Sequence, residues 1–215
     1  MDRRSLLAAL AVGPMLAELG KGETREARGA AQVLGAALSY GLGGKYDKSW
    51  SSSGVPEEVR HAGQRILSAS SKGTYCCGFT FAVAMKVLAE RGALEGRSAA
   101  ELRTFQKAWY GTSSETAEKQ CAVAVESLGV GREIAADDAR VGDFAQIWRK
   151  SDRPSGHSVL FLAWVREGKQ RTGISYLSSQ GSTDGIGFAV EHLELGDARR
   201  RRVDPERIYF ARLDD

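Results

Sequence analysis

The spacing of apolar residues changes once along the chain, near Gly131, and this change restricts the folds that the sequence can adopt. Before Gly131, apolar residues recur at helical spacing. After it, short segments rich in β-branched and aromatic residues are separated by turn residues, a pattern typical of strands. The strands that we expect are residues 144–148, 157–165, 174–179, 188–193 and 208–213. Helices followed by strands predict an α+β domain with an antiparallel sheet.

The helical half centres on a segment that is apolar on nearly all sides, Cys76 to Glu90. A helix of this kind is usually buried in the middle of a domain. A capping-box pattern at Ser98 and Glu101 predicts that another helix begins there. The full set of expected helices is residues 24–40, a helix that begins at Pro56 and carries Val59, Ile66 and Leu67, and residues 76–90, 98–109 and 112–128.

The composition suits one domain with a sizeable core, because 42% of the 215 residues are hydrophobic and 27% are charged. We therefore expect a single domain over residues 28–215. The formal net charge is only +3, so nothing requires a nucleic-acid partner. Three cysteines exclude a disulfide scaffold, and the three histidines are too scattered for a metal-ligand set. We expect neither a metal nor a cofactor.

The first 27 residues have the features of an export signal. Arg3 and Arg4 directly precede an apolar run from Leu6 to Ala17, as in twin-arginine signals. As a helix, this run would be about 18 Å long, too short for a hydrocarbon core of about 30 Å, so we expect no stable membrane insertion. The run ends without an Ala-x-Ala motif, which leaves cleavage near residues 27–30, or retention, as alternatives. An amphipathic first helix of the domain is the other interpretation.

The segment Thr74-Tyr75-Cys76-Cys77-Gly78-Phe79 lies where a loop enters the predicted buried helix. A thiol at the first turn of a helix is close to the positive end of the helix dipole and to unpaired N–H groups, and both favour the thiolate. Cys76 is therefore a candidate nucleophile. The alternative is that both cysteines are small buried apolar residues, which is the usual environment of a free cysteine.

A candidate base and a residue to orient it follow in the strand-rich half. His157 begins an apolar strand directly after a turn, with small neighbours that leave room for a thiol. The next strand ends with polar residues, and its alternation places Gln180 on the same face as Tyr176 and Ser178. Gln180 is the first candidate to orient the imidazole, because its amide oxygen has the necessary reach. The remaining candidates are Ser178, Ser179 and, as a lesser one, Asp184.

This order of residues resembles the papain-like cysteine peptidases and amidases, in particular the cell-wall hydrolases of the NlpC and CHAP types. Their nucleophile commonly lies in Asp-Cys-Ser-Gly-Phe. Alignment on Gly78-Phe79 matches Cys76 to that nucleophile. It also places Cys77 where serine is usual and Tyr75 where aspartate is usual. Two further motifs match in order, namely Gly142-Asp143, which begins a strand, and the histidine motif Gly156-His157-Ser158-Val159.

The resemblance implies a papain-like fold, in which N-terminal helices pack on a C-terminal antiparallel sheet and the nucleophile begins a central buried helix. In some relatives a tyrosine helps to hold the oxyanion, and the candidates here are Tyr46 and Tyr75. Cys77 is a further candidate to support the oxyanion or the nucleophile. In an exported protein, Cys121 could also form a disulfide with Cys77 or Cys76.

The expected function is that of a thiol hydrolase that cleaves an amide bond. Its substrate is a peptide, and the resemblance together with export implies a peptidoglycan peptide. Two other classes stay open. One is a catalytically inactive module of the same fold that binds a peptide or the cell wall. The other is an acyltransferase or transglutaminase that uses the same cysteine and histidine.

Overall fold

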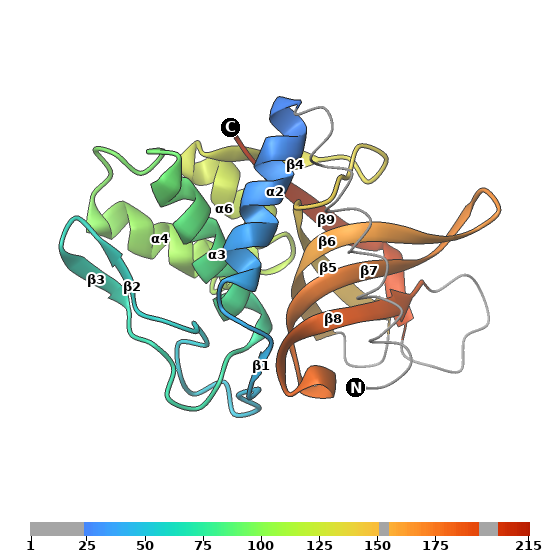
Figure 1. Ribbon diagram of the computed structural model, residues 1–215, viewed down its shortest axis with the longest axis horizontal. Coiled ribbons are helices and arrows are strands. Elements are labelled where there is room, and N and C mark those ends of the chain that lie inside the picture. The colour runs from blue at the N-terminus through green and yellow to red at the C-terminus, as the bar shows by residue number, and fades with distance from the viewer. Residues whose placement is uncertain (1–23, 151–154, 194–201) are drawn as a thin grey trace.

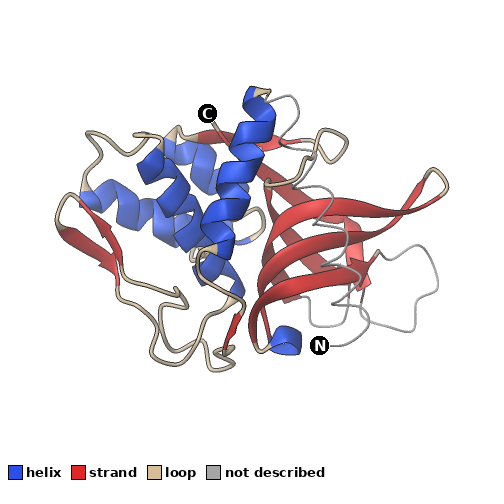
Figure 2. Cartoon of the chain, in the orientation of Figure 1, coloured by secondary structure: helices blue, strands red, loops and turns tan. Residues whose placement is uncertain are grey.

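The computed structural model describes residues 24–150, 155–193 and 202–215, which form a helical layer beside a curved sheet (Figures 1 and 2). The predicted export signal lies almost entirely outside the described residues. The helical elements are α2 (Arg25–Leu38), α3 (Cys76–Glu90), α4 (Ala99–Trp109), α5 (Ser114–Ala117), α6 (Cys121–Leu128) and the short 3-10 helix η1 (Gly181–Thr183). The strands are β1 (Gly43–Gly44), β2 (Val59–His61), β3 (Gln64–Leu67), β4 (Gly131–Ile134), β5 (Phe144–Lys150), β6 (Ser155–Glu167), β7 (Gln170–Gln180), β8 (Gly185–His192) and β9 (Arg202–Leu213).

The strands of the second half form the sheet that the sequence predicts. Within the described residues, seven strands pair in the order β1-β8-β7-β6-β5-β9-β4, and the neighbouring strands are antiparallel. Hairpin connections explain most of this order, because β6, β7 and β8 are consecutive in the chain and adjacent in the sheet. The prediction of an α+β fold with an antiparallel sheet is confirmed.

Helix α3 is the central element of the helical layer. It begins at Cys76 and ends at Glu90, as its apolar pattern predicts, and ten of its residues are buried. Its partners are α2 and α4 within the layer and β6 and β7 of the sheet. The chain also passes very close to its first turn, since a Cβ at Gly78 would lie 2.4 Å from the backbone carbonyl of Gly54. Glycine is therefore required where the preceding loop crosses the helix.

The prediction of a helix beginning at Pro56 is wrong, because this segment forms the β2–β3 hairpin. The two turn residues, Ala62 and Gly63, both have positive φ, which is the conformation of a tight hairpin turn. The helix predicted over residues 112–128 is divided into α5 and α6. The division is at Gln120, whose φ of 44° is incompatible with a continuous helix.

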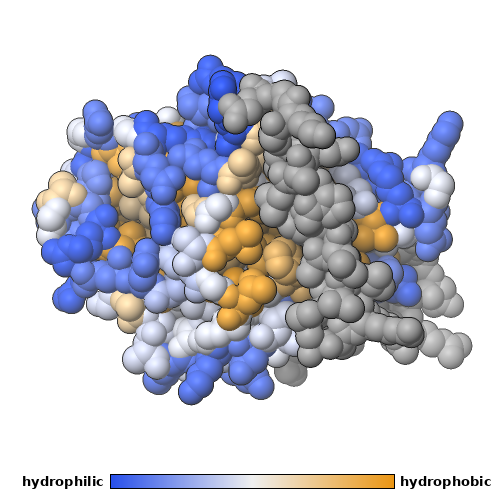
Figure 3. Space-filling view, viewed as in Figure 1, coloured by the Kyte–Doolittle hydropathy of each residue, from blue (hydrophilic) through white to orange (hydrophobic). Residues whose placement is uncertain are grey.

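Two apolar clusters lie on the two faces of the sheet. The larger one fills the space between the helices and the sheet, and the smaller one lies on the opposite face, between β5, β6, β7 and β9. The view in Figure 3 shows mostly hydrophilic residues over the helical layer, and apolar residues that gather between this layer and the sheet. The candidate residues lie at the end of the sheet, where β6 begins and β7 ends.

Candidate active site

Cys76 is the first residue of α3, and Tyr75 precedes it in an extended conformation with a φ of −139°. The side chain of Tyr75 makes no capping hydrogen bond to the helix. The first N–H groups of α3 therefore have no side-chain acceptor from the capping position, and they favour negative charge on the adjacent thiol. Cys76 as a residue is half-buried at the start of the helix.

The pKa of the Cys76 thiol is lowered well below its usual value. The largest contribution is a hydrogen bond with the Cys77 thiol, and burial acts in the opposite direction. The imidazole of His157 adds a favourable charge and a hydrogen bond, and the backbone N–H of Ser158 donates a further one. The fold therefore brings the sulfur of Cys76 next to the ring of His157, although the two residues are far apart in sequence.

The pKa of Cys77 is raised well above its usual value, mainly because its thiol proton is held in the hydrogen bond with Cys76 and because it is buried. The pKa values of the two neighbouring thiols are therefore shifted in opposite directions. The lowered pKa of Cys76 favours the thiolate at this residue, and the raised pKa of Cys77 favours its neutral thiol.

The buried ring of His157 is held by Gln180. Its Nε2 atom lies 3.1 Å from Oε1 of Gln180, while the amide nitrogen of Gln180 lies 3.5 Å from the carbonyl oxygen of Gly187. A carbonyl oxygen can only accept, so Nε2 carries the proton in this bond. In the neutral ring, Nδ1 is then left unprotonated, and it is the atom that can accept the thiol proton.

The two serines that were alternatives to Gln180 make other contacts. The Ser178 hydroxyl donates to the carbonyl oxygen of Ser158 at 2.6 Å, next to His157 in sequence. The Ser179 hydroxyl shares a 2.7 Å hydrogen bond with Thr74, which precedes the nucleophile by two residues. Both serines are completely buried. They connect the end of β7 to β6 and to the loop before α3, and so hold the candidate pair in place.

The two tyrosines that were candidates for the oxyanion differ in what their hydroxyls contact. The Tyr75 hydroxyl donates to the carbonyl oxygen of Ser52 at 2.9 Å, which uses its proton. Burial raises the pKa of Tyr46, and the charge of Cys76 raises it further, as it also does for Tyr75. Among the described residues, no hydrogen bond uses the hydroxyl proton of Tyr46. Asp184, the lesser candidate to orient the ring, accepts from the backbone N–H of Tyr46 at 3.3 Å. Tyr46 is therefore better placed than Tyr75 to donate toward a substrate.

An ion pair behind the imidazole was not predicted. Arg149 on β5 and Glu191 on β8 are joined by two short hydrogen bonds, of 2.6 and 2.5 Å. The Tyr176 hydroxyl donates to Glu191 at 2.6 Å, and its ring packs edge-on against that of His157, with 5.5 Å between centroids. Burial alone would raise the pKa of Glu191, but Arg149, His157 and Tyr176 lower it. A negative charge is thus held behind the candidate base.

One signal in the sequence could have indicated this ion pair. Tyr176 was already placed on the face of β7 that carries Gln180. Arg149 directly follows the expected strand 144–148 and Glu191 lies within the expected strand 188–193, and charged residues at such positions are rarely buried without a partner. Their pairing nevertheless depends on strand order, which the local pattern does not contain.

The three cysteines are free thiols, so the disulfides considered for Cys121 are not formed in this structure. Burial raises the pKa of Cys121 to about 12, which makes this thiol unreactive at neutral pH. Within the described parts of the chain, no group of three or more histidine, cysteine or acidic side chains could hold a metal ion. Among the same residues, no helix has the length and apolarity needed to cross a bilayer.

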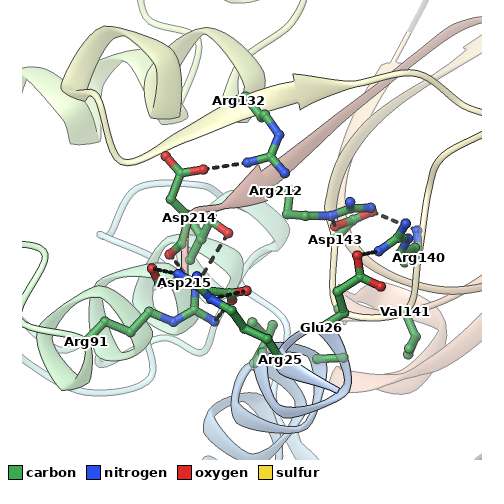
Figure 4. Close-up of a pocket in the computed structure, with 15 residues that line it drawn as sticks. Arg25, Glu26, Arg91, Arg132, Arg140, Val141, Asp143, Arg212, Asp214 and Asp215 are labelled. Carbon is green, nitrogen blue, oxygen red and sulfur yellow. Dashed lines mark hydrogen bonds and ion pairs between the residues drawn. The ribbon is translucent and has the colours of Figure 1, made fainter. Parts of the chain in front are cut away.

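A cavity of about 560 Å³ lies apart from this site, between α2 and the end of β9 (Figure 4). Its charges are largely compensated by one another. Arg212 forms a bidentate pair with Asp143, at 2.7 Å for both bonds, and Arg132 pairs with Asp214 at 2.6 Å. Asp143, which belongs to the motif that resembles the family, thus anchors the start of β5 to β9. It has no contact with the candidate nucleophile in this arrangement.

Comparison with protein-family models, with curated proteins and with solved structures finds no match to this chain. The fold and the site define an α+β protein in which a cysteine at a helix N-terminus meets a histidine from an antiparallel sheet.

Proposed function

We propose that the protein is a thiol hydrolase that cleaves an amide bond in a peptide. Cys76 is the nucleophile, His157 is the general base and acid, and Gln180 orients the imidazole. Two observations support this most. The buried imidazole of His157 lowers the pKa of the Cys76 thiol, and Nε2 of the same ring lies 3.1 Å from Oε1 of Gln180. Nucleophile, base and orienting group are then in the relation that covalent catalysis requires.

In the first half of the reaction, the Cys76 thiol gives its proton to Nδ1 of His157, and the thiolate attacks the carbonyl carbon of the amide. The C–S bond forms as the carbonyl π electrons move to oxygen. When the tetrahedral intermediate collapses, the C–N bond breaks, and the imidazolium gives its proton to the leaving amine. The acyl group is then held as a thioester on Cys76.

In the second half, His157 takes a proton from water, and the resulting hydroxide attacks the thioester carbonyl. The C–S bond breaks, the carboxylic acid leaves, and the proton returns to the sulfur. We assign the stabilisation of both oxyanions to two donors, namely the backbone N–H of Cys76 and the hydroxyl of Tyr46. Loss of one such donor typically costs about 3–4 kcal/mol of transition-state stabilisation.

The substrate class and the superfamily are part of the same proposal. A cysteine at the start of a central helix, a histidine on a following strand and an amide side chain on the next strand are the arrangement that a papain-like fold implies. The resemblance of Gly78-Phe79 and Gly156-His157 to the NlpC and CHAP motifs supports this fold. We propose peptidoglycan peptides as the substrate and export by the segment before residue 28 as the route to it.

The experiment is a comparison of Cys76→Ala with the unaltered protein on purified cell-wall sacculi, with released fragments identified by mass. Cys121→Ala is the matched control, since Cys121 is a buried thiol of α6. We expect release by the unaltered protein and by the control, and none by Cys76→Ala. Equal release by all three would refute the catalytic assignment.

Alkylation by iodoacetamide at neutral pH separates the remaining classes of protein. Selective modification of Cys76 is expected for a catalytic thiolate, whereas an unreactive Cys76 would indicate an inactive binding module. Adding an amine to the sacculi distinguishes hydrolysis from acyl transfer. A hydrolase releases free carboxylic acids, and a transferase releases amides of the added amine.

A further inference from the structure

Trp50 is an exposed aromatic side chain next to the candidate site. It is 62% exposed, which is more than any other large hydrophobic residue in the described part of the chain. Trp109, in contrast, is completely buried. Burying a large aromatic side chain contributes strongly to folding, so an indole in solvent forgoes that stabilisation. Large aromatic side chains held in solvent are typical of binding surfaces.

The backbone holds Trp50 in an unfavourable conformation. Its φ is 50°, in the left-handed region that costs a bulky residue about 1–3 kcal/mol. The loop is kept in this shape by the buried carboxylate of Asp47, which accepts from the N–H and hydroxyl of Ser49 at 2.9 and 2.6 Å and from the hydroxyl of Ser52 at 2.7 Å. These hydrogen bonds, led by those of Ser49, lower the pKa of Asp47 to about 2. The exposed indole is therefore fixed in position.

The same loop is attached to the segment that precedes the nucleophile. The Asp47 N–H donates to the carbonyl oxygen of Thr74 at 2.9 Å, and the Thr74 N–H donates to that of Lys45 at 3.0 Å. The Trp50 ring lies 6.5 Å, between centroids, from the ring of Tyr75. Since Tyr75 directly precedes Cys76, the indole lies against the residue next to the candidate nucleophile. A substrate long enough to extend past the thiol in that direction reaches it.

The loops that hold Trp50 carry three lysines, and one exposed carboxylate, Asp184, accepts from the backbone N–H of Tyr46 beside them. Lys45 and Lys48 are exposed, and neither forms an ion pair with a carboxylate among the described residues. Lys72 donates to the hydroxyl of Ser51 at 2.8 Å, next to Trp50 in sequence. The acid nearest in sequence, Asp47, is buried and already accepts three hydrogen bonds. The ammonium groups of Lys45 and Lys48, which lie close to Trp50 in sequence, are thus available to carboxylates of a ligand.

We propose that Trp50, Lys45 and Lys48 form a substrate subsite that binds an acidic segment of the peptide, next to the amide bond that Cys76 attacks. This inference rests on the proposed function, which supplies the peptide. The indole provides an apolar surface against which the peptide packs, and the two lysines select for carboxylates. Together these groups determine the substrate class of the same site.

The test is a binding measurement that needs no catalysis. The Cys76→Ala protein is titrated with a blocked pentapeptide, Ala-Glu-Ala-Glu-Ala, and with its counterpart in which both glutamates are glutamines. Tryptophan emission is the signal, and the same titration of Cys76→Ala with Trp50→Phe isolates the contribution of Trp50. We expect the acidic peptide to change the emission of Trp50 and to bind at least tenfold more tightly than the neutral one.

Two lysine variants make the test specific. Lys48→Ala in the Cys76→Ala background should remove most of the preference for the acidic peptide. Lys107→Ala, which removes an exposed lysine from the last turn of α4, should not change it. Equal affinity for the two peptides, or no change in Trp50 emission with either, would overturn the subsite. Release from sacculi by the unaltered protein would persist in that case, so failure of the subsite is distinguishable from failure of the hydrolase assignment.

Discussion

Replacing Gln180 with leucine removes the acceptor of the imidazole N–H and retains a buried side chain of similar size. In the thiolate–imidazolium state the donor of this bond is charged, and the bond contributes about 1.5–3 kcal/mol. In the neutral thiol–imidazole state it contributes about 0.5–1.5 kcal/mol. The substitution therefore disfavours the ion pair by about 1–1.5 kcal/mol. The ratio of the ion pair to the neutral pair falls about tenfold as a result.

The assay is the rate of iodoacetamide alkylation of Cys76 as a function of pH, followed by mass spectrometry of the modified peptide. We expect the midpoint for Gln180→Leu to move to higher pH, because a less stable imidazolium requires more alkaline conditions for the thiolate to form. Cys121→Ala is the control, since Cys121 is a buried thiol of α6 and is not among the groups that shift the pKa of Cys76. If both variants have the midpoint of the unaltered protein, Gln180 does not act on the candidate pair and the reasoning is refuted.

Two further predictions concern the packing around the site. Glu191→Gln leaves the Arg149 guanidinium without its carboxylate in a mostly buried position, so the free energy of unfolding should fall by about 3 kcal/mol in urea titrations. Because the folded-state pKa of Glu191 is lowered, its stabilisation is present at neutral pH and is lost as the pH falls through that lowered pKa, a loss that the variant should lack. Gly78→Ala should lower the thermal midpoint, although alanine is the better helix former by about 1 kcal/mol, since its Cβ would meet the Gly54 backbone. Gly35→Ala, at an open and exposed position of α2, should raise it; a rise in both would contradict the packing argument.

Local sequence patterns predicted those elements whose ends are set by nearby residues, such as a capping box or the limits of an apolar segment. Helix α3 extends over its apolar segment, and α4 begins after Ser98, where the capping box is formed in both directions. The hairpin in place of the helix expected at Pro56 shows the limit of this approach. Proline is favourable in the first turn of a helix. Ala62 and Gly63, however, have positive φ and form a hairpin turn, which a helix cannot contain. Alanine rarely adopts a positive φ, so Ala62 did not indicate a hairpin turn in the sequence.

Local sequence patterns predict one part of the candidate site and do not predict the other. Cys76 and His157 were identified from their immediate neighbours. The pair of Arg149 with Glu191 joins β5 to β8, two strands that are not adjacent in the sheet, and it depends on the curvature of the sheet. The position of Trp50 likewise depends on the loop that Asp47 organises, and exposed loops carry no periodic signal.

The contact of Gln180 with His157 was within reach of the sequence because a hairpin has a countable register. β6 and β7 are joined by a tight turn in which Glu167 pairs with Gln170. From that pair, each step back along β6 corresponds to one step forward along β7. Ten such steps place residue 180 opposite residue 157. Two irregularities intervene, one after Val165 and one between Phe161 and Ala163, but the first shifts the pairing by one residue and the second restores it. A single bulge would instead have moved Gln180 one position along β6 and turned it away from the ring, since a slip of one residue exchanges the two faces of a strand. The orientation of the candidate base therefore depends on two compensating bulges, and deleting one residue at either bulge should separate Gln180 from His157 while leaving the hairpin turn intact.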